Sequence, residues 1–363
     1  MKVVVTGTRG IPNIMGGVET HCEELFPRIA AAGHDVTVIR RSCYVGDDNH
    51  ISSYKGVALK DIYAPRKKSL EAIVHTFLAV LSARRMHADI LHIHAIGPAL
   101  LVPYAKMLGL KVVFTHHGPD YDRDKWGMAA KLMLKLGERM GTTFANEVIV
   151  ISEVINDILV RKYGRRDCRL IYNGVPEPDC CDYDEYFKEL GIEKGKYILS
   201  MCRFVPEKNL HHLVEAFSKI DAKGCKLVLA GDTDFEDDYS RKLKAMAREN
   251  RVVLTGFVKG QKLHSLLTHT RCFVLPSSHE GLPIALLEAM SYKLQVIISN
   301  IPANLEVGLP YENYFQTGDI NALVEKLQKN IDTPYAHTEY DMSEYDWEHI
   351  ADQVDEVYKI LIP

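Results

Sequence analysis

The chain has 363 residues, 47% of them hydrophobic and 25% charged, with a formal net charge of −4 and an isoelectric point near 6.5. This length suits two domains, and the slightly acidic balance argues against a nucleic-acid-binding protein, which is basic overall. The eight cysteines include no C-x-x-C pair, so we expect free thiols and a cytoplasmic protein. The amino-terminal MKVVVTGTRG lacks the long apolar core of a signal peptide, and no stretch reaches the length of a transmembrane helix.

Short apolar segments alternate with helical patterns through the first half of the chain. Such alternation is typical of a parallel sheet that is covered on both faces. We predict strands at 2–6, 35–40, 57–63, 90–94, 111–115, 147–151 and 169–172, with helices that include 18–32, 69–86 and 125–141.

The loop after the first predicted strand has the sequence GTRGIPNIMGGVET, at 7–20. Gly16 and Gly17 precede a helix, where they would let the backbone pass close to a ligand. The dinucleotide fingerprint G-x-G-x-x-G is absent. A flexible turn is the alternative interpretation.

Histidines follow two neighbouring strands of the predicted sheet. His116 and His117 lie in FTHHGPDYDRDKWG at the carboxyl edge, where an imidazole could donate to a sugar hydroxyl or a phosphate, or transfer a proton. His92 and His94 could line the same edge. Four histidines suggest zinc, but the spacing and the carboxylate support for a metal cage are thin. A hydrogen-bonded structural histidine is an equal alternative for His116 and the preferred one for His92 and His94.

The pattern changes after residue 173, where a segment rich in Pro, Gly and acidic residues indicates a linker. The alternation then restarts, with predicted strands at 196–201, 226–230, 252–255, 271–275 and 295–299, and a last helix at 344–361. The economical interpretation is an α/β protein with two Rossmann-like, doubly wound domains. Their predicted bounds are 1–175 and 196–342, with a linker at 176–195 and a terminal segment at 343–363.

Arg203 and Lys208 flank a proline turn between a strand and a helix of the second domain. At a strand's carboxyl end this pair suits a diphosphate, because the Arg fork gives bidentate bonds and Lys a point charge. The triplet Asp232-Thr233-Asp234 could hold a divalent cation, but such triplets are common and we favour a solvated loop.

Two glutamates flank a helix start in PSSHEGLPIALLEAMSY, at 276–292. Glu280 lies in the loop after a strand, and Pro283 is placed at the first helical position. Glu288 lies inside an apolar helical run, where a buried carboxylate needs hydrogen-bond donors such as ribose hydroxyls. The alternative is that the helix turns Glu288 toward solvent.

Together these motifs resemble the retaining glycosyltransferases of family 4, which have the GT-B architecture. The resemblance spans nearly the whole chain in the expected order, and GTRGIP with GGVET also resembles capsule and exopolysaccharide rhamnosyltransferase-like members. The matching residues are Gly16-Gly17 with Glu19, His117-Gly118, Ser152, Asn173-Gly174-Val175, Arg203, Lys208, Gly231, Gly256-Phe257 and the 280–288 block. The resemblance implies two domains facing across a cleft and a last helix that crosses back onto the first domain.

The resemblance also implies a role for each matching residue. Arg203 and Lys208 would bind the donor diphosphate, and Glu280 and His117 would contact the transferred sugar. Glu288 would hold the ribose, Gly17 would let the backbone approach the phosphate, and no metal is required. The remaining donor-binding positions that it implies are Gly16, Gly231, Gly281, Leu282 and Pro283. The GDT at 231–233, where the family often has a second glycine, puts the phosphate contacts there in doubt.

The implied reaction is front-face transfer of a sugar from a UDP-sugar or dTDP-rhamnose to a saccharide or lipid-linked acceptor, in capsule, exopolysaccharide or lipopolysaccharide synthesis. The basic ends and apolar run of 66–86 suggest peripheral contact with the inner face of the membrane, with a sheet-covering helix as the preferred alternative. Other functions stay open: a nucleotide-sugar epimerase, a nicotinamide dehydrogenase without the fingerprint, or a catalytically silent nucleotide-sugar-binding module.

Overall fold

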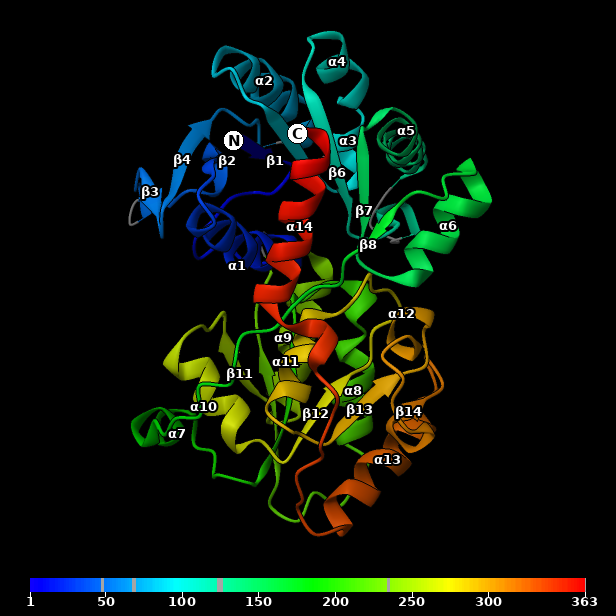
Figure 1. Cartoon of the computed structure of the whole chain (residues 1–363). Coiled ribbons are helices and arrows are strands. Elements are labelled where there is room, and N and C mark those ends of the chain that lie inside the picture. Colours follow the sequence, from blue (N-terminus) through cyan, green and yellow to red (C-terminus); the bar gives the residue numbers. More distant parts are fainter. Residues whose placement is uncertain (47–48, 67–69, 123–126, 234–235, 363) are drawn as a thin grey trace. The chain divides into compact units, whose positions relative to one another are not determined.

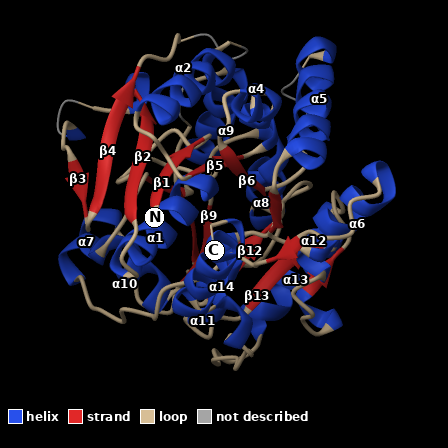
Figure 2. Cartoon of the chain, turned by 45° about the horizontal axis from the view of Figure 1, so that its top comes forward, coloured by secondary structure: helices blue, strands red, loops and turns tan. Residues whose placement is uncertain are grey.

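The computed structural model describes the chain except for residues 47–48, 67–69, 123–126, 234–235 and 363 (Figure 1). The chain forms two compact units, Met1–Gly174 with Glu344–Pro363, and Val175–Ser343. Each unit contains its own sheet, and helices flank the strands (Figure 2).

The first unit has an eight-stranded sheet in the order β3-β4-β2-β1-β5-β6-β7-β8. All neighbours are parallel except β3, which pairs antiparallel with β4. The direction of strand addition reverses between β1 and β5, which is the topological switch point of this sheet. The strands are β1 (Lys2–Thr6), β2 (Asp35–Arg41), β3 (Ser53–Tyr54), β4 (Val57–Ile62), β5 (Ile90–His94), β6 (Lys111–His116), β7 (Glu147–Val150) and β8 (Arg169–Leu170).

The C-terminal helix α14 (Trp347–Leu361) packs beside α1 (Gly17–Ala31) in the first unit (Figure 1). Its buried face, which includes Trp347, Ile350 and Tyr358, shares one apolar cluster with Phe26 of α1. The end of the chain therefore completes the core of the first unit. The other helices of this unit are α2 (Glu71–Arg85), α3 (Ile96–Ala99), α4 (Val102–Met107), α5 (Met128–Phe144) and α6 (Glu153–Tyr163).

The second unit has a six-stranded parallel sheet in the order β11-β10-β9-β12-β13-β14, with its switch point between β9 and β12. The strands are β9 (Tyr197–Met201), β10 (Lys226–Ala230), β11 (Val253–Gly256), β12 (Cys272–Leu275), β13 (Val296–Ser299) and β14 (Tyr314–Phe315). The helices are α7 (Asp184–Leu190), α8 (Leu210–Phe217), α9 (Asp238–Glu249), α10 (Gln261–His269), α11 (Ile284–Ser291), α12 (Pro302–Leu305) and α13 (Ile320–Asp332).

The predicted strands correspond to strands of the structure, with ends that differ by up to two residues. The segment 176–195 is more than a linker, because it contains α7, whose Tyr186 and Phe187 are buried in the second unit. The two-residue strands β3 and β14 were not predicted. Within the described residues, no helix is both long and apolar enough to span a membrane.

Candidate functional site

The loop after β1 is ordered by Glu19 of α1. The buried Glu19 Oε1 accepts hydrogen bonds from the Thr8 hydroxyl at 3.2 Å and from the Arg9 amide at 2.9 Å. The Arg9 guanidinium also donates to the carbonyl of Met15 at 3.2 Å. These contacts give the loop a hydrogen-bonded conformation at the switch point of the first sheet.

Gly16 and Gly17, at the end of this loop, differ in whether the structure leaves room for a larger side chain. Gly16 has φ 150°, and a Cβ atom there would lie 2.0 Å from Oε2 of Glu19. Gly17 is exposed at the start of α1, and a Cβ there would meet nothing within 4 Å. Gly16 is thus required by the fold, whereas the space above Gly17 is open for a ligand at the helix N-terminus.

Three histidines meet at the carboxyl edge of the first sheet. The ring of His117 lies 4.9 Å from that of His21 and 5.2 Å from that of His94, centroid to centroid. His94 Nδ1 and His117 Nε2 share a hydrogen bond at 2.9 Å. The sequence placed His94 and His117 at this edge but missed His21, which comes from the first turns of α1. His92 lies behind them, bonded to the Tyr358 and Thr115 hydroxyls at 2.6 Å each, and is structural.

Burial keeps this histidine cluster neutral. It lowers the pKa of His21 to about 4, against a partial increase from the hydrogen bond to Asn173. Burial, followed by the neighbouring imidazoles, also lowers the pKa of His94 and His117 well below the usual value. At neutral pH the edge therefore offers imidazole donors and lone pairs rather than positive charge.

His116 anchors the loop that carries His117. Its Nδ1 accepts a hydrogen bond from the Gly118 amide at 3.1 Å, and its Nε2 therefore donates to Glu138 of α5 at 3.0 Å. Glu138 is fully buried and also accepts from the hydroxyls of Tyr121 at 3.0 Å and Tyr163 at 2.7 Å. Sequence reasoning missed Glu138, because one acid in an amphipathic helix resembles a surface residue.

A lysine–glutamate pair occupies the switch point of the second sheet. Lys208 follows β9 and Glu280 follows β12, and Lys208 Nζ lies 2.5 Å from Glu280 Oε1. The two side chains are only 18% and 9% exposed. Arg203, partly buried, lies between β9 and Lys208, where Phe204 N donates to the carbonyl of Asp232. The structure thus brings together Lys208 and Glu280, which are 72 positions apart in the sequence.

Gly231 is held at the end of β10 by close backbone packing. Its φ is 127°, and a Cβ atom there would lie 2.0 Å from the carbonyl oxygen of Cys202. The next residue, Asp232, pairs with Lys244 at 2.7 Å and accepts from the Thr233 amide at 2.8 Å. Asp234 lies outside the described residues, so the triplet is seen only in part, and its first acid is engaged by a lysine.

Helix α11 begins at Ile284, and Pro283 is its N-cap rather than its first helical residue. The Pro283 carbonyl accepts from the Leu286 and Leu287 amides at 3.0 and 3.3 Å. Leu282 and Pro283 are buried and Gly281 is partly buried. Glu288 lies four residues after Ile284 and is partly buried, so it is neither in the apolar core nor turned fully to solvent.

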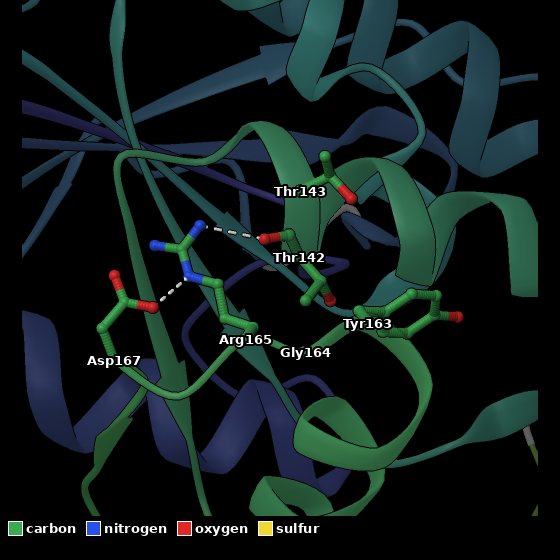
Figure 3. A pocket seen from close by; sticks show the side chains of 6 residues that line it. All are labelled: Thr142, Thr143, Tyr163, Gly164, Arg165 and Asp167. Carbon is green, nitrogen blue, oxygen red and sulfur yellow. Dashed lines mark hydrogen bonds and ion pairs between the residues drawn. The ribbon is translucent and has the colours of Figure 1, made fainter.

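A surface pocket of the first unit is lined by Thr142, Thr143, Tyr163, Gly164, Arg165 and Asp167 (Figure 3). Arg165 spans it, pairing with Asp167 at 2.7 Å and donating to the Thr142 carbonyl at 3.0 Å. The same guanidinium donates to the carbonyls of Ala145 and Asn146, and so satisfies the C-terminal end of α5. The pocket precedes β7 and β8, at the edge opposite the switch point, and its contacts are structural.

Comparison with known proteins defines the class. Residues 15–177 match the model of Glycosyltransferase Family 4, and residues 182–359 match that of Glycosyl transferases group 1. These two glycosyltransferase models together account for most of the chain, and the two-domain fold with parallel sheets is that of the GT-B glycosyltransferases. The chain therefore belongs to the glycosyltransferases, of the family 4 type, and the predicted α/β fold class is confirmed.

Relatives extend over the whole chain. An uncharacterised glycosyltransferase of Methanocaldococcus jannaschii is 24% identical over 99% of this chain and 98% of its own. A GDP-mannose:cellobiosyl-diphosphopolyprenol alpha-mannosyltransferase of Xanthomonas oryzae is 26% identical over 78% of this chain and 77% of its own. Among solved structures, HepE of Anabaena in complex with UDP-glucose has a TM-score of 0.80 at 17% identity, covering 99% of each chain.

Proposed function

We propose that this glycosyltransferase moves a sugar from a nucleoside-diphosphate sugar to a saccharide or lipid-linked saccharide, with retention of configuration and without a metal ion. The observation that carries the proposal is the Lys208–Glu280 pair beside Arg203 at the second switch point. Lys208 is held at the sheet edge before the donor arrives, and a positioned cation stabilises the charge of a diphosphate. HepE, which has the same fold, was crystallised with UDP-glucose.

Each proposed contact follows from the chemistry of the side chain. Arg203 and Lys208 neutralise the charge that grows on the leaving diphosphate. Glu280 exchanges its bond to Lys208 for hydroxyls of the donor sugar, and Glu288 accepts from the ribose hydroxyls. Backbone amides at the start of α11 meet phosphate oxygens, with Pro283 contributing no N–H.

Transfer takes place on one face of the sugar. The acceptor oxygen bonds to the anomeric carbon as the bond from that carbon to the phosphate oxygen breaks. The acceptor proton passes to the departing phosphate, so no protein base is needed. The two carboxylates therefore act in binding rather than as the acid and base of a hydrolase. Asp232, paired with Lys244, is not assigned a metal.

The acceptor side is assigned to the first unit, where His117 and the Gly16–Gly17 loop lie. The named acceptor of the Xanthomonas relative is a diphosphopolyprenol-linked sugar. A lipid-linked acceptor requires the enzyme to reach a membrane surface, and we propose peripheral binding at the cytoplasmic face during capsule, exopolysaccharide or lipopolysaccharide synthesis.

Helix α5 is a better membrane contact than the predicted segment 66–86. In α2 the residues His75, Ala79 and Val80 are buried against the sheet, and Lys67 and Lys68 lie outside the described residues. The outer face of α5 instead exposes Met128, Leu132 and Leu136, at 89%, 68% and 41%. These residues recur every fourth position, and exposed Lys135 and Arg139 lie beside them. An apolar stripe flanked by cations suits an anionic bilayer.

Vesicle flotation tests this surface. Leu132→Glu with Leu136→Glu is expected to abolish flotation with anionic vesicles, while Leu305→Glu, at a 49% exposed position of the second unit, leaves it intact. Equal flotation of both variants would overturn the assignment to α5.

The function is tested in two steps. Thermal shifts with UDP, dTDP and GDP identify the base, and a radiolabelled donor with a lipid-linked acceptor then measures transfer. Proton NMR of the product reports the anomeric configuration, and an inverted product would disprove the retaining mechanism. Donor conversion without an acceptor would indicate an epimerase, and binding without turnover a silent module.

A further inference from the structure

Among the residues that the structure describes, His21, His94 and His117 are the one group that could hold a metal ion. Each offers one ring nitrogen, and the three nitrogens lie within 4.8 Å of one another. The residues come from the start of α1, the end of β5 and the loop after β6, which are ordered elements of one unit. The proposed glycosyl transfer uses only His117 of the three.

Two of these rings have a buried nitrogen without a partner. His21 Nδ1 bonds to Asn173 Oδ1 at 3.0 Å. Because an amide oxygen only accepts, His21 carries its hydrogen on Nδ1 and presents a lone pair on Nε2. Neither His21 Nε2 nor His94 Nε2 has a hydrogen-bond partner in the described part of the chain, and both atoms are buried.

The arrangement around His21 is that of a metal-binding histidine. Such a histidine donates its second ring N–H to an oxygen, which fixes the ring and its tautomer. Asn173 does this for His21, and Trp347, with its ring 5.5 Å away, packs against the imidazole. His117 is only half-buried and gives the group access to solvent.

We propose that His21, His94 and His117 form a three-histidine site for a zinc-class transition-metal ion, and that the ion inhibits the enzyme. Three neutral imidazoles with one open position suit Zn²⁺ or Co²⁺. With no carboxylate among the three, Mg²⁺ and Ca²⁺ are disfavoured. Binding takes the lone pair of one nitrogen from each of the three rings.

The inhibition follows from His117 and rests on the proposed function. A metal bond fixes the ring orientation and the tautomer of His117, so the metal and the proposed sugar contact compete for one residue. Metal binding itself does not depend on glycosyl transfer. An experiment can therefore disprove the metal site without disproving the proposed function, and the reverse also holds.

Metal binding is measured directly on the tag-free full chain. Co²⁺ titration followed by visible absorption is expected to show one tetrahedral ion per chain, which Zn²⁺ displaces. His21→Gln is expected to weaken Co²⁺ binding at least about tenfold. His349→Gln, which changes an exposed histidine of α14, is the matched control and leaves binding unchanged.

Should His21→Gln fail to fold, Asn173→Ala removes the oxygen that orients His21 and is expected to weaken binding about tenfold. In the transfer assay, Zn²⁺ lowers the rate of the wild type and excess chelator restores it. His21→Gln, compared with its own metal-free rate, resists Zn²⁺. The proposed metal site is wrong if the wild-type chain binds no Co²⁺. It is also wrong if neither His21→Gln nor Asn173→Ala weakens Co²⁺ binding.

Discussion

The two switch points differ in charge. At the first sheet, His21 and His94 are buried, His117 is half-buried and all three are neutral, whereas at the second sheet Lys208 and Glu280 form an ion pair. A neutral edge can recognise hydroxyls but contributes little to a diphosphate, whereas the lysine of a charged edge can stabilise a diphosphate. Under the proposed function, the same sheet topology serves charge stabilisation in the second unit and orientation of hydroxyl groups in the first.

The largest effect is expected from removing the charge at the second edge. Lys208→Met should lower kcat/KM for transfer about 10²–10³-fold, as removal of one preorganised electrostatic partner does. Lys219→Met is the matched control, since Lys219 makes an exposed pair with Glu215 and should leave kcat/KM unchanged. Full activity in Lys208→Met would break the proposed contrast between the two edges.

Each edge also has a glycine, and the two should respond differently. Gly231→Ala places a Cβ 2.0 Å from the Cys202 carbonyl at a positive φ, and should destabilise the second unit by about 3 kcal/mol in urea unfolding. Gly17→Ala meets nothing within 4 Å and should not lower stability. If the backbone at Gly17 approaches a substrate, the same change raises KM. A normal KM with normal stability would exclude that approach.

The neutral edge depends on a charge buried behind it. Burial alone would raise the pKa of Glu138, but hydrogen bonds from His116 and Tyr163, and the charge of Lys162, outweigh it and lower the pKa. The stabilisation from Glu138 is therefore present above its unfolded pKa of about 4.3 and is lost as the pH falls through the lower folded value.

Glu138→Gln should cost about 1–3 kcal/mol, because an amide cannot accept from three donors as a carboxylate does. It should also lower transfer by loosening the His116–Gly118 anchor. Tyr163→Phe removes one of the same bonds and serves as the milder comparison. Loss of stability in Glu138→Gln with normal transfer would show that the anchor does not position His117.

Sequence patterns predict the strands well and the buried polar partners poorly. Apolar runs such as 90–94 and 272–275 are sufficient to locate β5 and β12, and strand ends then place His94 and Glu280 at sheet edges. Glu138 and His21 were not predicted because their roles depend on hydrogen-bond partners that are distant in the sequence. Glu138 bonds to His116, 22 positions away, and His21 bonds to Asn173, 152 positions away. Helix α7 was not predicted because the segment around it is acidic and rich in proline, which is typical of a linker, and only Tyr186 and Phe187 indicate a buried helix face.

The smallest effect tests how far the neutral character of the first edge extends. His75 of α2 is buried beside Arg41 at the end of β2, and burial, together with the Arg41 charge, lowers its pKa to about 3. Because the unfolded histidine binds a proton below about pH 6.5 and the folded one does not, stability falls as the pH drops from 6.5 toward 3. Between about pH 7.5 and about pH 5.5 this amounts to about 1 kcal/mol.

His75→Leu should flatten that slope, whereas His349→Leu, at an exposed position, should keep it. The free energy of urea unfolding at several pH values measures the slope. An unchanged slope in His75→Leu would mean that His75 is protonated in the folded chain, which would require the Arg41–Glu71 pair beside it to rearrange and the first edge to carry charge after all.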